Sequence, residues 1–207
     1  MKPTKKRNTK ANLLQAAERL FAENGLGGVS VRDITRAAGA RNESALHYHF
    51  GDMSALIREV FAHRYREIEK ARMARLAELD AANRGHDIEA LLEAAIAPLF
   101  ETCLDKEGRL YARFGVQLVT DPRFDALELV TETQMSSATT IRDRALETLA
   151  HLPEETVRTR LRRLFTLSII LMADYARLIE AGTAPPLQEA IEEARASLAG
   201  FLQAPLH

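Results

Sequence analysis

The chain has 207 residues and a formal net charge of −1, with 28 Lys and Arg against 29 Asp and Glu. Its 33 alanines and 28 leucines outnumber its seven valines and ten isoleucines, a bias that favours helices and argues against sheets. The single cysteine, Cys103, excludes an internal disulfide and a zinc site built from cysteines. The longest strongly apolar run, Phe165 to Ala173, is shorter than the roughly 20 residues that span a bilayer. We therefore expect an all-α, cytoplasmic protein with no membrane partner.

The charge is unevenly distributed along the chain. Residues 1–50 carry nine Lys and Arg against four Asp and Glu, so this segment is +5 and the remainder is −6. A basic segment on an acidic body is typical of a protein whose one end contacts a polyanion. The alternative is a basic tail that only keeps the chain soluble, which is the simpler interpretation of the first ten residues alone.

The basic segment predicts three helices. The first runs from Thr9 to Asn24 and ends at a glycine-rich stretch. The S-x-x-D pattern of Ser30 and Asp33 is a capping box that starts the second helix. The third begins at residue 41 or 42 and ends at residues 50–51. Its spacing places Leu46 and Phe50 on the inner face, and the opposite face carries Glu43, Ser44, His47 and Tyr48.

The remaining chain predicts further helices and no repeat. They are one capped by Asp52 that runs toward residue 83, one from Asp87 that Pro98 should kink or break, one between Gly108 and Asp121, one over roughly 124–152, one from Pro153 to Gly182, and one from Leu187 to about Gln203.

Two short helices joined by residues 39–41 and braced by a longer one are typical of a helix-turn-helix. Any small three-helix bundle has a similar outline. The local charge of +5 and an outward face bearing Ser, His and Tyr favour DNA binding.

Residues 14–25, 29–34, 37–39 and 45–51 resemble the TetR family of transcriptional regulators in order, spacing and residue type. The resemblance does not extend in detail beyond about Glu59. It implies a helix-turn-helix DNA-binding domain over residues 1–52 and a ligand-binding and dimerisation domain over residues 53–207. It also implies a homodimer that places one recognition helix per subunit in a major groove of double-stranded operator DNA.

The resemblance further implies a set of DNA-contacting residues: Ser30, Arg41, Asn42, Glu43, Ser44, His47, Tyr48 and His49. Ser30, Tyr48 and His49 are expected at phosphates, and positions 41–47 at bases. Two features depart from the family pattern. Met53 stands where family members commonly have a phosphate-binding lysine, and the turn before the third helix is one residue longer. Arg41 could supply the missing positive charge.

His47 and His49 also invite a metal-binding interpretation. Their i, i+2 spacing on a helix points the two rings apart, and no other His or Cys is near in sequence. We therefore expect no metal and no cofactor, and interpret both residues as DNA contacts or as ordinary packing.

The helix from Pro153 to Gly182 carries two parallel apolar stripes, which indicates two packing partners. One stripe includes Phe165 and Met172, and the other includes Leu167 and Leu171. A four-helix interface formed with the last helix of each subunit would explain both stripes, although a helix buried within one domain would too. The family resemblance favours the dimer. The predicted interface residues are Leu161, Phe165, Ser168, Met172, Leu187, Ile191, Leu198 and Phe201.

In the resembled family, the middle helices enclose a small-molecule cavity, which needs apolar walls and a few polar groups. The predicted lining is Phe100, Cys103, Tyr111, Phe114, Gln117, Gln134, Met135, Met172 and Tyr175. The same residues also describe an ordinary core, and for Cys103 a buried, inert thiol is the simpler expectation.

We find no phosphate loop, metalloprotease motif or nucleophile elbow, so no catalytic residues are predicted. The sequence is interpreted as a transcriptional regulator, a repressor released from its operator by a small, largely apolar effector. Activation and corepression stay open. The alternatives from other classes are an all-α enzyme and a ligand-independent helical scaffold, and neither explains the basic segment.

Overall fold

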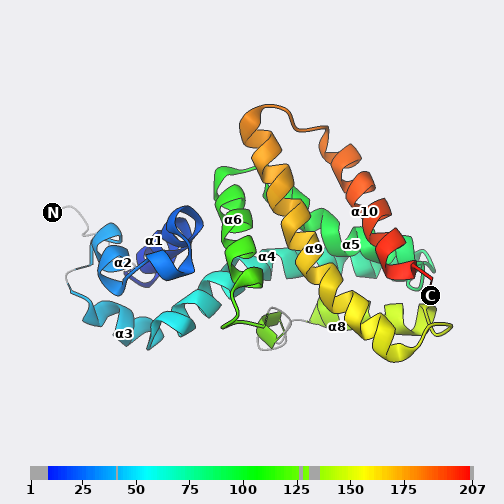
Figure 1. Cartoon of the computed structure of the whole chain (residues 1–207), viewed down its shortest axis with the longest axis horizontal. Coiled ribbons are helices and arrows are strands. Elements are labelled where there is room, and N and C mark those ends of the chain that lie inside the picture. The colour runs from blue at the N-terminus through cyan, green and yellow to red at the C-terminus, as the bar shows by residue number, and fades with distance from the viewer. Residues whose placement is uncertain (1–8, 41, 126–127, 131–135, 206–207) are drawn as a thin grey trace.

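The computed structural model describes residues 9–40, 42–125, 128–130 and 136–205. Within these ranges every regular element is a helix, which confirms the all-α prediction (Figure 1). The elements are α1 (Thr9–Asn24), η1 (Leu26–Gly28), α2 (Val31–Ala37), α3 (Ser44–Phe50), α4 (Met53–Ala81), α5 (Ile88–Thr102), α6 (Lys106–Thr120), α8 (Ser136–Thr148), α9 (Glu154–Ala181) and α10 (Leu187–Gln203).

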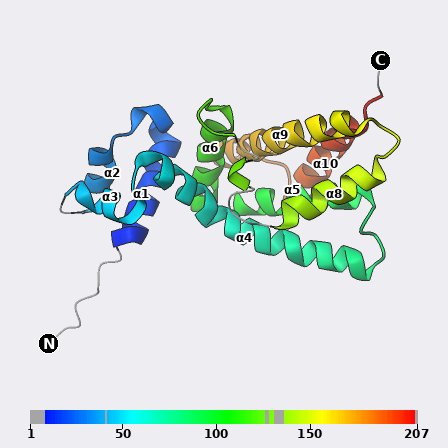
Figure 2. The same cartoon turned by 90° about the horizontal axis from the view of Figure 1, so that it is seen from below.

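The helices form two packed groups joined by one long helix. α1, α2 and α3 lie together at one end, and α4 runs from them along the body formed by α5, α8, α9 and α10 (Figure 2). α6 lies between the two groups and packs against α1 on one side and α9 on the other. No helix of the described ranges is long and apolar enough to cross a membrane.

Local chemistry sets most helix ends where the sequence predicts them. Ser30 Oγ accepts a hydrogen bond from the Asp33 N–H at 3.2 Å, and Asp33 Oδ2 accepts one from the Ser30 N–H at 3.1 Å, so the predicted capping box is confirmed. Asp52 caps α4 by accepting a backbone N–H three residues on at 2.7 Å. Gly182 ends α9 in the left-handed conformation, with φ of 70°.

Of the kink or break predicted at Pro98, the structure excludes the break. Helix α5 continues through this residue from Ile88 to Thr102, and residues 94–100 are all buried. Proline removes one backbone hydrogen bond from a helix interior. Packing against α4, α8, α9 and α10 holds α5 in place, so tertiary contacts override the local preference.

Two other predicted boundaries also differ. Gly108 lies inside the first turn of α6 rather than before it, because Asp105 Oδ1 accepts the Gly108 N–H at 2.6 Å and caps the helix earlier. Phe124 and Asp125 are not helical. Of the helix predicted over 124–152, residues 128–130 are helical and α8 covers Ser136 to Thr148. Residues 126–127 and 131–135 of that prediction lie outside the described residues.

The N-terminal group has its own core, and α1 also docks it to the body. Ile34 and Leu46 are fully buried against α1. On the other side of α1, the rings of Phe21 and Phe114 lie 6.1 Å apart. Beside them Arg64 Nε donates to Glu18 Oε1 at 2.9 Å, and only 6% of Glu18 is exposed. The N-terminal helices are therefore fixed to α4 and α6 by buried contacts.

The close approach of the first turn of α6 to the end of α5 requires a glycine at position 108. A Cβ there would lie 1.7 Å from the backbone oxygen of Thr102. Because backbone cannot yield as a side chain can, Gly108→Ala is expected to lower the free energy of unfolding by about 3 kcal/mol or more. Gly27→Ala is the control, since nothing lies within 4 Å of its Cβ position, and its effect should stay within about 0.5 kcal/mol. Denaturant melts of both variants measure this, and equal stabilities would contradict the assigned turn.

Candidate nucleic-acid interface and cavity

α3 divides cleanly into a buried face and an exposed face. Leu46 is fully buried and anchors the helix between α1 and α4. On the other side Glu43, Ser44 and His47 are exposed, and Tyr48 is 85% exposed. The sequence predicted this division from helical spacing. It leaves a polar and aromatic face that contributes nothing to the core.

Local hydrogen bonds fix the orientation of two side chains on this face. Ser44 Oγ donates to Asn42 Oδ1 at 2.7 Å, just before the helix begins. His47 Nδ1 lies 2.7 Å from the backbone oxygen of Gly51. A carbonyl oxygen can only accept, so Nδ1 carries the proton of neutral His47. Nε2 is then left as a hydrogen-bond acceptor.

His49 differs from His47 in its surroundings. Its ring is half-buried and meets the Tyr48 ring edge-on, with centroids 5.0 Å apart. The Phe50 ring lies beyond it, at 6.3 Å. His49 therefore supports Tyr48 from the side. In the described part of the chain, no three His, Cys, Asp or Glu side chains gather as a metal site would require.

Ser30 is exposed, as a phosphate contact must be, but its hydroxyl is already committed. Ser30 Oγ–H donates to Asp33 Oδ2 at 2.5 Å, and these bonds hold the pKa of Asp33 below its usual value. Arg32 and Arg36 are exposed on the same helix, α2. These cations belong to the basic segment, but no sequence pattern assigned them to the interface. Arg41 lies outside the described residues.

The residues predicted to line a cavity come together as a packed core instead. Phe100, Cys103, Tyr111, Phe114, Met172 and Tyr175 are each at most 5% exposed. The Cys103 thiol donates to the Met172 backbone oxygen at 3.5 Å, and burial raises its pKa to about 12, so the expected buried, inert thiol is confirmed. Gln117 is exposed, and Gln134 and Met135 lie outside the described residues.

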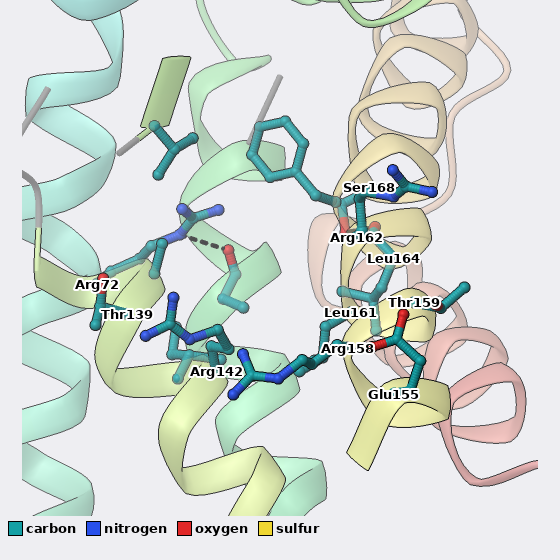
Figure 3. Close-up of a pocket in the computed structure, with 15 residues that line it drawn as sticks. Arg72, Thr139, Arg142, Glu155, Arg158, Thr159, Leu161, Arg162, Leu164 and Ser168 are labelled. Carbon is teal, nitrogen blue, oxygen red and sulfur yellow. Dashed lines mark hydrogen bonds between the residues drawn. The ribbon is translucent and has the colours of Figure 1, made fainter. Parts of the chain in front are cut away.

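A cavity of about 370 Å³ lies elsewhere, between α4, α5, α8 and α9 (Figure 3). None of the seven described residues of the predicted lining borders it. Its apolar lining consists of Ala95, Val130, Ala138, Ile141, Leu161, Leu164 and Phe165. Its polar lining consists of Arg72, Thr139, Arg142, Glu155, Arg158, Thr159, Arg162 and Ser168.

The residues predicted for a dimer interface divide into two groups. Ser168, Met172, Ile191 and Leu198 are at most 4% exposed within their own chain, so the prediction is wrong for these four because they have no surface to offer a partner. Leu161 and Phe165 are half-buried and border the cavity, and Leu187 and Phe201 are half-buried on α10.

The second apolar stripe of α9 is the more accessible one. Leu167 and Leu171 are half-buried, and Ile170 between them is 42% exposed. Helical periodicity identified both stripes, but it could not tell which one the subunit's own core covers. Ile170 was not assigned to either stripe.

An all-helical chain with a helix-turn-helix at one end and a cavity-bearing bundle at the other has the architecture of a one-component regulator. Residues 13–60 match the family model for bacterial regulatory proteins of the tetR family, and residues 93–204 match that for the tetracyclin repressor-like C-terminal domain. The chain belongs to the TetR family of transcriptional regulators, which confirms the resemblance.

Curated relatives and solved structures agree with this assignment. The chain is 30% identical to the transcriptional regulator AcrR of Shigella flexneri over 103 residues, covering 49% of this chain and 45% of AcrR. It is 32% identical to the repressor Rv3405c of Mycobacterium tuberculosis over 112 residues, covering 54% and 48% respectively. The chain thus spans about half the length of the curated relatives it matches.

Two solved structures share the fold over nearly the whole chain. A tetR-family regulator from Shewanella superposes with a TM-score of 0.65 at 20% identity, covering 95% of this chain and 97% of that one. NalD of Pseudomonas aeruginosa, a repressor of the MexAB-OprM efflux pump, superposes with a TM-score of 0.57 at 20% identity, covering 96% and 98%.

Substitutions on the two faces of α3 should separate folding from DNA contact. Leu46→Ala leaves a cavity at a fully buried position and should lower the free energy of unfolding by about 2–5 kcal/mol. Tyr48→Phe removes only an exposed hydroxyl, so its melting temperature should equal that of the wild type. Its affinity for operator and for random duplex should fall alike, by about 1 kcal/mol, because a phosphate carries no base identity. A shared loss of melting temperature in the two variants would show that Tyr48 points inward.

Proposed function

We propose that this chain is a dimeric repressor that binds a two-fold symmetric operator and is released by a small-molecule effector. The observation that carries the proposal is the exposed face of α3, where Ser44, His47 and Tyr48 have no role in the core. The basic charge of the first fifty residues suits a polyanionic partner. Rv3405c and NalD, to which the chain is similar, are both repressors, which supports repression rather than activation.

In this proposal α3 enters the major groove and His47 reads a base. An Nε2 acceptor pairs with an exocyclic amine, which adenine and cytosine present in that groove. Ser44 contacts a base edge beside it, together with Asn42 and Glu43 at the start of the helix. Tyr48 and His49 contact phosphates on one flank, and Arg32 and Arg36 of α2 contact them on the other. Arg41 remains assigned to the DNA face by the family pattern alone.

The effector site is proposed to be the cavity between α4, α5, α8 and α9. α4 begins at Met53, directly after α3, and reaches the cavity at Arg72. Arg72 follows Met53 by 19 residues of this helix, which corresponds to about 28 Å. A ligand that binds better to one position of α4 shifts the spacing of the two recognition helices. The operator is then released because the helices no longer match successive major grooves.

The partner subunit is proposed to pack on the outer face of α9, with α10 beside it. Ile170, Leu167 and Leu171 supply an accessible apolar stripe there. The division at residue 52 into a DNA-binding and a dimerisation domain stays part of this proposal. α4 is then the first element of the second domain.

DNA binding tests the proposal against an all-α enzyme or a scaffold. Affinity for fragments from the chain's own upstream region should fall about a thousandfold between roughly 50 and 200 mM salt, as phosphate contacts require. Arg32→Gln should flatten the dependence of log K on log salt by about one or two units per dimer. Arg84→Gln changes an exposed arginine in the turn between α4 and α5, and it should leave this dependence unchanged. Absence of any salt-sensitive binding would count against the regulator.

Charge on the outer face of α9 should separate the subunits. Ile170→Arg is expected to give a monomer in light scattering at micromolar concentration, because an unpaired charge at an apolar interface is costly. Leu104→Arg is the matched control, since Leu104 is 59% exposed at the turn between α5 and α6. The control should remain a dimer. A monomeric wild type, or a dimeric Ile170→Arg, would overturn the assigned interface.

A further inference from the structure

Arg72 is a buried cation on the wall of the cavity. Only 4% of this α4 residue is exposed. Its Nε donates to the Ala95 backbone oxygen at 2.8 Å, and its Nη1 donates to the Tyr65 hydroxyl at 2.5 Å. The guanidinium carbon also lies 5.3 Å from the centre of the Tyr65 ring. All of these partners are electrically neutral.

No described carboxylate lies within 4.0 Å of the Arg72 guanidinium, the limit for an ion pair, although several acidic residues are close to Arg72 in sequence. Glu69, one helical turn earlier, is the natural candidate. Its carboxylate instead accepts both the backbone N–H and the hydroxyl of Ser137, and so holds α8 against α4. The charge of Arg72 therefore remains uncompensated within the part of the chain that the structure describes. Burying such a charge without an anion is costly.

The rest of the polar lining has the same sign. Arg142, Arg158 and Arg162 border the cavity, whereas Glu155 is the one described carboxylate there. Arg142 and Arg158 pair with neighbouring acids outside the cavity, at 2.8 Å and 2.6 Å. In Figure 3 both side chains lie below Arg72, and Arg158 extends from α9 toward Arg142 of α8. The lining of the cavity thus carries four arginines against one described carboxylate.

Part of the wall is apolar. Leu161, Leu164 and Phe165 of α9 line the cavity beside the polar residues of that helix, and Ile141 of α8 joins them. A site with one buried cation and an apolar wall matches a molecule with one anionic end and a hydrocarbon remainder. We propose that the cavity binds an amphipathic organic carboxylate, whose carboxylate bonds the Arg72 guanidinium and whose tail packs on α9.

This inference replaces the expected largely apolar effector with an organic anion. The binding site stands on its own geometry, and only its role as the effector site rests on the proposed function. Binding is therefore measured first on the full-length protein without DNA.

The test compares decanoate with decan-1-ol, which share a tail and differ in charge at neutral pH. By calorimetry the wild type should bind decanoate at least about tenfold more tightly than the alcohol, the scale of hydrogen bonds to a charged group. Arg72→Met should lose this preference and keep its affinity for the alcohol, which shows that the cavity is intact. Arg72→Lys, which keeps the charge, should retain part of the preference.

Arg75→Met is the matched control. Arg75 lies on the same helix, pairs with Glu101 at 2.5 Å and does not border the cavity. Its preference for decanoate should equal that of the wild type. Equal binding of acid and alcohol by the wild type, binding of neither, or an unchanged preference in Arg72→Met would each overturn the proposal. If Arg72→Met binds neither ligand, the Arg72→Lys variant decides, and loss of its preference for the acid would overturn the proposal as well.

DNA affinity measured on the same preparations separates this inference from the function it deepens. Decanoate should weaken operator binding by the wild type and leave that by Arg72→Met unchanged. Salt-sensitive operator binding without any preference for decanoate contradicts the anion site alone. A preference for decanoate without DNA binding contradicts the regulator alone.

Discussion

The docking of α1 against α4 and α6 is the constraint on which the arrangement of the molecule depends. Phe21 packs on Phe114, and the nearly buried Glu18 carboxylate pairs with the partly exposed Arg64. Burial raises the pKa of Glu18 even though the paired Arg64 opposes it, so desolvation outweighs attraction at this contact. Separating the pair would leave a charge buried alone, at a cost of about 3–5 kcal/mol. The N-terminal helices therefore follow α4 and α6 as one unit.

This constraint makes α4 suited to carry a signal. Arg64, which docks α1, and Arg72, which borders the cavity, lie eight residues apart on one uninterrupted helix, a separation of about 12 Å. The position of α4 decides whether the Arg72 guanidinium can reach a ligand in the cavity. An anion bound to Arg72 would neutralise its charge only in a position that allows this contact. A ligand can shift a conformational equilibrium only by its differential affinity for the two states. Because the partners of Arg72 within the chain are neutral, an anion that reaches this charge in only one position of α4 would bind that position more tightly.

The parts of the fold that were predicted correctly are those that local chemistry decides. Ser30 and Asp33 form a capping box from four adjacent residues, and Asp52 and Gly182 end helices by their own backbone and side-chain geometry. The inner and outer faces of α3 follow from spacing in the same way. The break that was one outcome expected at Pro98 does not occur, and four of the predicted interface residues are buried within their own chain, because tertiary partners decide both features. Periodicity shows that a face is apolar, but not which neighbour covers it.

The candidate cavity was missed for a related reason, although one signal was present. The predicted lining joined aromatic and sulfur-containing residues of the middle helices, and such residues pack equally well into a solid core. Arg72 was not singled out from the sequence. Yet Tyr65, Ile68 and Leu76 stand three or four residues from one another or from Arg72, and all are at most 2% exposed. An arginine within an apolar stripe is a charge at a core position, and a sequence breaks its own pattern in this way where a function requires it.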